Sequence, residues 1–173
     1  KKQGKTCEAL IGDVSQAKDM EDAVHTIVGR CGRIDILVNN AGINTVRDRA
    51  PIHEYSKEDW DRILLVDLTG VFVTSRVVIP VMLENKGGRI VNISSIAGLV
   101  PLRLQSAFVA AKAGVVNLTR SMALELGPRG ILVNAVAPGS TLTRGTEALF
   151  YGPDGNYSDT VASLLSHIPL GRP

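Results

Sequence analysis

The sequence is poor in aromatic residues and has no cluster of like charges. Aromatic side chains make up only 4% of the 173 residues, so the 45% of apolar residues are mostly Val, Ile, Leu and Ala. This composition suits buried parallel strands covered by helices. The formal net charge is +2, and the positive residues are scattered along the chain. Such a pattern gives little support to binding of nucleic acid or of an anionic membrane surface.

Cysteines and long apolar runs are also scarce. The two cysteines, Cys7 and Cys31, lack the spacing of metal ligands and indicate free thiols in a reducing compartment. No apolar run approaches the roughly 18 residues that cross a membrane. We therefore expect a cytoplasmic protein with no metal site and no membrane span.

Four short apolar segments are typical of buried strands, and helical segments separate them. The strands are expected at residues 8–13, 34–40, 89–94 and 131–138, and the helices at 15–32, 56–88 and 106–126, with bends at Gly70 and Pro80. This alternation indicates an α/β fold, a doubly wound parallel sheet with helices on both faces. The carboxyl ends of all strands then meet at one edge, where such sheets bind ligands. Polar residues such as Asp13, Asn39 and Ser95 lie at those ends.

Two helical stretches, residues 69–84 and 106–126, are apolar almost all round. A helix of this kind usually covers the sheet with one face and a partner with the other. We expect these helices to pack against their copies in a homodimer or homotetramer. Burial of both helices wholly within one monomer is the alternative.

Four motifs follow one another in order and at regular spacing. They are "LVNNAG" (37–42), "RIVNISSIAG" (89–98), "FVAAKAG" (108–114) and "ILVNAVAPGS" (131–140). Together they resemble the short-chain dehydrogenase/reductase family, in particular its 3-oxoacyl carrier-protein reductases and sugar dehydrogenases. The resemblance implies a Rossmann-type fold that binds NAD or NADP and moves a hydride between nicotinamide and a carbonyl or secondary alcohol. It also implies one dinucleotide-binding domain over residues 1–173, with a substrate lid at about 141–170.

The resemblance further implies where the cofactor would lie. Its contacts would come from residues at the strand ends: Asp13 and Val14 at the adenine, Asn39, Ala41 and Gly42 along its length, and Pro138, Gly139 and Thr141 around the nicotinamide carboxamide. Small residues let the backbone approach a ligand closely. Taken singly, each stretch is also typical of a strand end that enters a turn. Because all of these residues are expected at one edge of the sheet, cofactor binding is favoured over ordinary turns.

The catalytic positions implied by the resemblance contain one departure. Ser95 would hydrogen-bond the substrate oxygen, or would merely cap the next helix. Lys112 would hold the nicotinamide ribose, or would be an ordinary solvated lysine. The family's proton-donating tyrosine is replaced by Phe108, thirteen residues after Ser95 and four before Lys112. Since general acid catalysis accelerates a reaction by roughly 10²–10⁴-fold, we expect poor reduction of ordinary ketones unless water, Ser95 or another acid donates the proton.

Asp67 stands where the family often has a relay asparagine. Its carboxylate is expected either to pair with Lys112 or to accept a backbone hydrogen bond. A substitute acid from the lid is a further hypothesis, and the candidates are Tyr151, Tyr157 and His167. More often such residues shape the pocket or pack beneath the lid.

A glycine-rich phosphate loop is absent from this sequence. We expect the first strands that would carry it, and the closing helix and strand, to be missing from the chain, so that NAD and NADP cannot be distinguished. Two other interpretations stay open. One is a catalytically impaired cofactor-binding homologue with an assembly or regulatory role, and the other is a structural α/β domain without cofactor.

Overall fold

The computed structural model divides the chain into two compact units, Lys1–Ala137 and Pro138–Pro173. It describes residues 7–44 and 49–143, and in the tail Thr146, Phe150, Tyr151, Asn156, Tyr157, Val161, Leu165, Ser166 and 168–173. Whether the two units act as one domain with a lid stays a prediction. The core elements described next all belong to the first unit.

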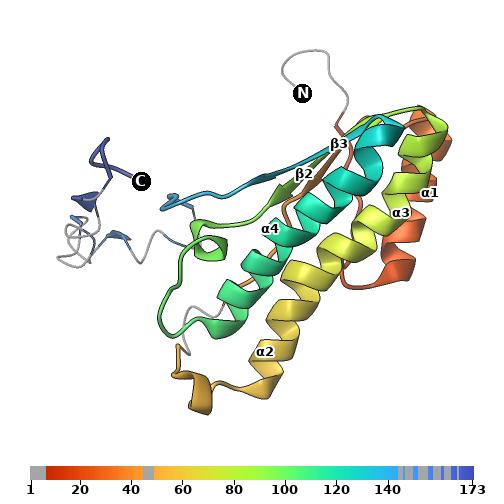
Figure 1. Ribbon diagram of the computed structural model, residues 1–173. Helices are drawn as coiled ribbons and strands as arrows, with labels where there is room; N and C mark the ends of the chain where they lie inside the picture. Colours follow the sequence, from red (N-terminus) through yellow and green to blue (C-terminus); the bar gives the residue numbers. More distant parts are fainter. Residues whose placement is uncertain are drawn as a thin grey trace. The chain divides into compact units, whose positions relative to one another are not determined.

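Strands and helices of the first unit alternate in the expected order (Figure 1). The strands are β1 (Ile36–Asn39), β2 (Gly88–Ile93) and β3 (Ile131–Val136), and the helices are α1 (Ala17–Cys31), α2 (Lys57–Leu64), α3 (Gly70–Glu84) and α4 (Ser106–Leu126). Short 3-10 turns lie at η1 (Ile52–Glu54), η3 (Ile96–Gly98) and η4 (Gly127–Arg129). Three of the four expected strands and all the expected helical segments are thus confirmed.

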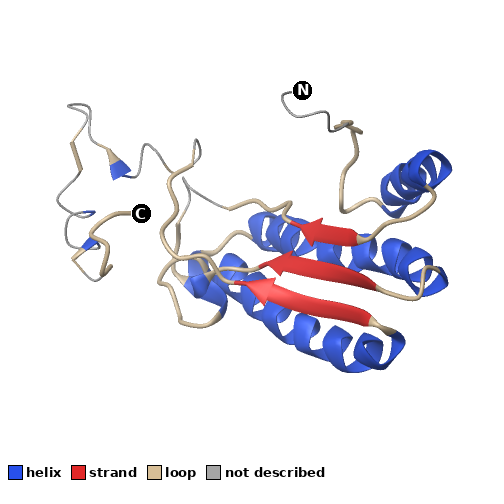
Figure 2. Ribbon diagram, turned by 90° about the horizontal axis from the view of Figure 1, so that it is seen from above, coloured by secondary structure: helices blue, strands red, loops and turns tan. Residues whose placement is uncertain are grey.

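The three strands form one parallel sheet in the order β1-β2-β3. Leu37, Ile90 and Val133 lie in register, and their side chains pack against the helices in the main hydrophobic core. Figure 2 shows the described helices behind one face of the sheet. The other face exposes apolar side chains such as Ile36 and Leu132. The predicted parallel α/β sheet is confirmed, but among the described residues the helices cover one of its faces and not both.

Residues 8–13 do not form a strand, so this prediction was wrong. No described strand lies beside the segment, and a strand needs a neighbour to satisfy its backbone hydrogen bonds. The side chain of Ile11 is fully exposed as a result. The segment ends in a turn, in which the Ser15 backbone N–H donates to Asp13 Oδ1 at 2.8 Å.

One continuous helix runs from Lys57 to Glu84 through α2, the π-helical turn η2 (Leu65–Thr69) and α3. Ser56 caps it as predicted, because its Oγ accepts a hydrogen bond from the Asp59 backbone N–H. By length and by a mean hydropathy of 1.8 over 18 residues the helix is apolar enough to cross a membrane, contrary to the expectation from the sequence. Core helices of globular proteins pass the same test, and this one carries the buried carboxylate of Asp67 in its middle.

Candidate active site

Lys112 lies at the centre of the site. Its side chain projects from α4 into the protein, and the residue is only 6% exposed. Its Nζ lies 3.0 Å from Asp67 Oδ2 and donates a hydrogen bond to the Ile93 carbonyl oxygen at 3.2 Å. A buried charge needs such partners. Lys112 is therefore not a solvated surface lysine.

Asp67 reaches Lys112 from the π-helical turn η2 and is completely buried. Its second carboxylate oxygen, Oδ1, accepts a hydrogen bond of 2.7 Å from the Ile43 backbone N–H. Both expected interactions of Asp67, the ion pair and the backbone hydrogen bond, therefore occur together. The carboxylate joins three segments far apart in sequence: the loop after β1, the helix Lys57–Glu84 and α4.

Two glycines lie directly against this arrangement. A Cβ added to Gly42 would lie 3.1 Å from Asp67 Oδ2 and 3.4 Å from Lys112 Nζ. A Cβ added to Gly98 would lie 2.6 Å from the Lys112 carbonyl oxygen. Real Cβ atoms avoid the shorter distance, so a side chain at either position would displace its neighbours. The missing side chains let the backbone pass close to the ion pair on one side and to α4 on the other.

Ser95 lies half-buried at the carboxyl end of β2, where it caps η3. Its Oγ accepts a hydrogen bond from the Ala97 backbone N–H at 3.1 Å, which leaves its own proton available for a ligand. The preceding residue, Ser94, donates from Oγ to the Lys112 carbonyl oxygen at 2.8 Å. Ser95 and Lys112 are therefore brought to the same end of β2, as the sequence predicted, and the capping alternative for Ser95 is also correct.

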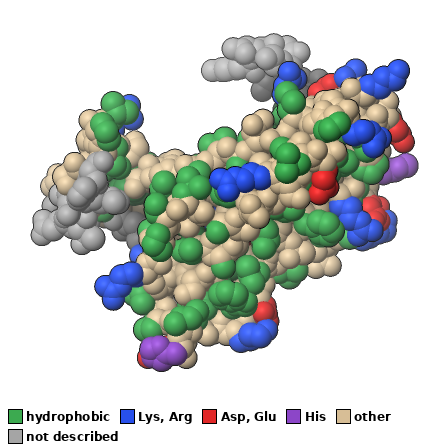
Figure 3. Space-filling model, in the orientation of Figure 1, with side chains coloured by type: hydrophobic (Ala, Val, Ile, Leu, Met, Phe, Trp, Pro, Cys, Tyr) green, Lys and Arg blue, Asp and Glu red, His purple; other side chains and the backbone are tan. Residues whose placement is uncertain are grey.

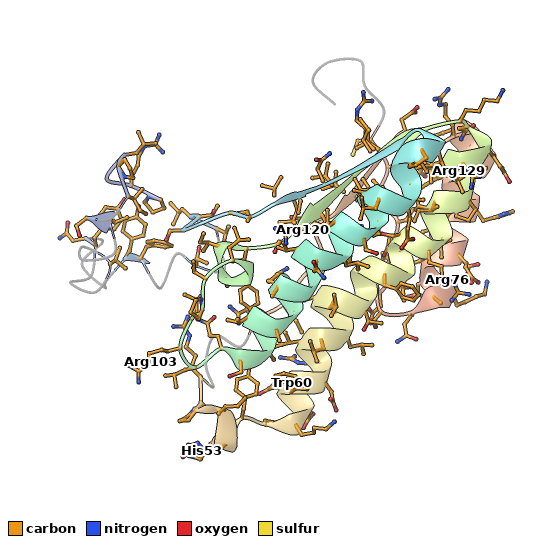
Figure 4. All side chains as sticks on the ribbon, in the orientation of Figure 1. His53, Trp60, Arg76, Arg103, Arg120 and Arg129 are labelled. Carbon is orange, nitrogen blue, oxygen red and sulfur yellow. The ribbon has the colours of Figure 1, made fainter. Side chains whose placement is uncertain are left out.

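Phe108 presents its ring to the lysine ammonium, with Lys112 Nζ 5.6 Å from the ring centroid. This is a cation–π distance. The ring also packs against a small apolar cluster that includes Ile63 and Ala111, with Trp60 of α2 at its border (Figure 4). Phe108 thus fills space and faces the charge, but it supplies no proton to the site.

Several residues predicted to bind the cofactor gather at one small cavity of about 70 Å³. Val14, Asn39 and Ala41 line it together with apolar residues of the helix Lys57–Glu84. Asp13 is exposed beside Val14, and hydrogen bonds from the Ser15 backbone and side chain lower the pKa of the Asp13 carboxyl. Gly42 lies on the ion pair rather than in this cavity.

The Asn39 side chain belongs to the core. Its amide donates to Ser75 Oγ at 3.0 Å and to Asn92 Oδ1 at 2.8 Å, and Asn92 in turn donates to Thr119 Oγ1 at 2.9 Å. These four buried residues form a polar ladder from α3 across β1 and β2 to α4. Sequence reasoning missed Ser75, Asn92 and Thr119. The available signal was a polar residue on the apolar face of each element.

Pro138, Gly139 and Thr141 belong to the second unit. There Thr141 Oγ1 donates to the Gly139 carbonyl oxygen at 3.4 Å. Their proposed contacts with the nicotinamide stay a prediction.

Tyr151 and Tyr157, which were expected in the lid, stack on each other, with ring centroids 5.1 Å apart and an interplanar angle of 18°. This stacking gives both rings a packing role within the second unit. His167 lies outside the described residues. A lid residue as the proton donor therefore stays a hypothesis.

The amino-acid sequence is similar to a family of dehydrogenases and to individual reductases and dehydrogenases. The family model described as short chain dehydrogenase matches residues 1–152. The chain is 42% identical over 160 residues to the 3-oxoacyl-(acyl-carrier-protein) reductase FabG of Thermotoga maritima, covering 92% of this chain and 61% of the relative. It is 37% identical over 169 residues to 2-(S)-hydroxypropyl-CoM dehydrogenase 3 of Xanthobacter autotrophicus, covering 98% and 65%.

A solved structure agrees with these relatives. The gluconate 5-dehydrogenase of Burkholderia cenocepacia, in complex with NADP and tartrate, aligns with a TM-score of 0.82 at 31% identity. The alignment covers 93% of this chain and 60% of that protein. The chain thus spans less than two thirds of the length of each of these three proteins.

Proposed function

This chain belongs to the short-chain dehydrogenase family, and we propose that it forms part of an oxidoreductase that uses NAD or NADP. The reaction transfers a hydride between the nicotinamide and the carbon of a carbonyl or secondary alcohol, while a proton is exchanged at the oxygen. The proposed substrate is a small molecule of the 3-oxoacyl or the sugar and polyol type.

The observation that carries the proposal is the buried ammonium of Lys112, which donates to the carbonyl oxygen of Ile93 at the end of β2, two residues before Ser95. Two of the contacts of Lys112 Nζ are used by Asp67 and by the Ile93 carbonyl, which leaves one N–H for a ribose hydroxyl. Ser95 keeps its proton for a substrate oxygen. The ammonium of Lys112 suits a ribose hydroxyl of the cofactor, and the hydroxyl of Ser95 suits the carbonyl oxygen of the substrate.

The residues at the neighbouring strand end fit the flat, largely apolar base of a dinucleotide. The cavity between Val14 and Ala41 is lined mainly by apolar residues, with Asn39, Asn40 and Thr74 also in its wall. Exposed Asp13 directly precedes Val14 and has a carboxylate that can accept from an amine. Gly42 brings its backbone close to the ion pair without a side chain in the way. Asn39 would contribute through its backbone, because its amide is committed to the core. Pro138, Gly139 and Thr141 would contact the nicotinamide end.

Proton transfer is the weak point of the site. Phe108 occupies the position from which the family's tyrosine donates, and its ring faces Lys112 without an exchangeable hydrogen. We propose that the protein reduces ordinary ketones slowly, with water or Ser95 as the proton source. The alternative, a cofactor-binding homologue that serves in assembly, is not favoured by the similar proteins, which are named as reductases and dehydrogenases.

Either function would operate in an oligomer, and the exposed apolar side chains of two helices support this. Phe72 of α3 is 50% exposed and Leu124 of α4 is 81% exposed. Figure 3 shows hydrophobic side chains along the same face of the molecule. Residues 69–84 and 106–126 are therefore the proposed contact of a homodimer or homotetramer. We place the protein in the cytoplasm and assign residues 141–170 to a substrate lid.

Calorimetric titration of the complete gene product with NADH and NADPH tests the proposal. Saturable binding of either cofactor, with measurable carbonyl reduction, would support the oxidoreductase. Binding without turnover, both in the native protein and in Phe108→Tyr, would favour the assembly role. Absence of binding to both cofactors would contradict either function and leave a structural α/β domain.

A further inference from the structure

A loop with exposed apolar side chains begins at the candidate active site. Between Ser95 and Phe108, five apolar side chains are between 37% and 57% exposed: Ile96, Leu99, Val100, Leu102 and Leu104. We call these five residues the apolar rim. Single exposed apolar residues are ordinary on a protein surface, but clustered ones are typical of binding surfaces, and here five lie within nine consecutive positions.

The apolar rim is continuous with the residues of the site. Its first member, Ile96, opens the turn η3 that Ser95 caps. Within the same segment, Gly98 packs so closely on α4 that an added Cβ would lie 2.6 Å from the Lys112 carbonyl oxygen. At the far end, Gln105 is buried at the start of α4. Both ends of the rim are therefore fixed to the elements that hold Ser95 and Lys112.

The rim offers few polar side chains to a ligand. Gln105 Oε1 already accepts a hydrogen bond from Asn44 Nδ2 at 3.0 Å. Arg103 is exposed on the outer side of the loop (Figure 4), and hydrophobic side chains gather beside this edge in Figure 3. Residues 95–108 contain no Asp or Glu. A polyhydroxylated ligand is recognised by several directed hydrogen bonds, whereas an alkyl chain requires apolar area.

We infer that the substrate is a ketone or secondary alcohol with an alkyl chain, and that this chain lies on the apolar rim. The inference rests on the proposed function and narrows it, because it favours acyl-like over sugar-like substrates. Ser95 would hold the oxygen of the substrate at one end of the rim, and Leu99 and Leu102 would cover the chain beyond it.

Initial-rate measurements on the complete gene product carrying Phe108→Tyr test this substrate class. Straight-chain 2-ketones of four to eight carbons are compared with a ketohexose, using the cofactor that binds. We expect kcat/KM to rise roughly two- to fourfold per methylene as the chain is buried. Leu99→Ser/Leu102→Ser should flatten this dependence, and the milder Val100→Thr, which keeps the side-chain shape, should weaken it. Arg103→Ser, in the same loop but polar, should leave it unchanged.

Three outcomes would overturn the inference. A ketohexose that is reduced as well as the longest ketone would assign the site to sugars. A chain-length dependence that is the same with and without Leu99→Ser/Leu102→Ser would place the chain elsewhere. A change in the mass of that variant, measured by light scattering, would show that the rim contacts a second subunit instead.

Failure of the proposed oxidoreductase function can be distinguished from failure of the inference about the substrate. No turnover of any carbonyl would contradict the oxidoreductase, and calorimetric titration of the cofactor-loaded protein with 2-octanol and with a hexitol would then decide the ligand class. Tighter binding of the octanol, lost in Leu99→Ser/Leu102→Ser, would still support the apolar rim. Equal or tighter binding of the hexitol would refute it.

Discussion

Replacing Phe108 with tyrosine tests the chemistry of the site most directly. The substitution adds one hydroxyl to a ring whose centroid lies 5.6 Å from Lys112 Nζ. A general acid at this position accelerates carbonyl reduction by roughly 10²–10⁴-fold. We expect Phe108→Tyr to reach the lower part of this range, because a second charge acts on the new phenol.

That second charge is the carboxylate of Asp67. Its Oδ2 lies 3.0 Å from Lys112 Nζ, and Lys112 Nζ lies 5.6 Å from the centroid of the Phe108 ring. The carboxylate oxygen is therefore within the sum of these two distances from the ring centroid. At an effective dielectric constant of about 20, a carboxylate at this distance opposes a phenolate by about 2 kcal/mol. Removing the charge with Asp67→Asn should raise the rate of Phe108→Tyr further, by up to about 30-fold. The asparagine oxygen can still accept from the Ile43 backbone N–H.

The assay is single-turnover oxidation of bound NADH or NADPH by a saturating ketone, followed by absorbance in the native protein, both single variants and the double variant. Phe108→Leu is the matched control, because it changes the ring without adding a proton donor. Cofactor affinity and thermal unfolding are measured for every protein. A gain of less than tenfold in Phe108→Tyr, with cofactor binding intact, would refute the assignment of Phe108 as the missing acid. A double variant no faster than Phe108→Tyr would refute the role given to Asp67.

Three further predictions concern stability, and urea unfolding of the complete gene product measures each. Gly98→Ala places a methyl group against the backbone of α4 and should lower the free energy of unfolding by about 1–3 kcal/mol. Gly29→Ala, whose added methyl group has no neighbour, should raise the free energy of unfolding by about 0.5–1 kcal/mol. Equal effects of the two substitutions would contradict the close contact between Gly98 and α4. Asn92→Leu removes two buried hydrogen bonds and leaves one N–H of the Asn39 amide without its acceptor, although Asn39 still donates to Ser75 and Thr119 to the Val115 carbonyl; it should cost about 1–3 kcal/mol. Asn134→Leu on the exposed face should be nearly neutral. Because hydrogen bonds from the following turn lower the pKa of Asp13, its carboxylate stabilises the fold above the ordinary aspartate pKa, and this contribution is lost as the pH falls through the lowered value. Asp13→Asn should therefore be less stable than the native protein at neutral pH and equally stable in strong acid, and a difference independent of pH would count against this account.

Much of the fold could be predicted from the sequence because the relevant signals are local. The apolar β-branched segments gave β1, β2 and β3, and the helical pattern gave α4 with its observed bounds. The strand expected at residues 8–13 failed, because a strand depends on a neighbour and not only on its own composition. Local pattern therefore predicts an element only where the rest of the structure supplies its partner.

The candidate site was only partly predictable. Spacing along the chain predicted that Ser95, Phe108 and Lys112 would meet, since they lie on consecutive elements of a parallel sheet. The polar ladder was not predictable, because it joins Asn39 to side chains from three elements whose alignment in space is not encoded in any short segment. Asn39 was accordingly expected on the cofactor, although its amide points into the core. A motif can identify a residue without identifying the direction of its side chain.

The π-helical turn η2 has a consequence for changes in chain length. This turn holds one more residue than an α-helical turn, and Asp67 projects from it toward Lys112. Deleting a single residue within this turn would convert it into a regular α-helical turn and leave the flanking segments facing nearly as before, whereas deleting one from α3 would rotate everything before it by about 100° relative to the rest of the helix. The second deletion would turn Ile63 and Trp60 away from α4, so α3 should tolerate the loss of a residue far less well than η2.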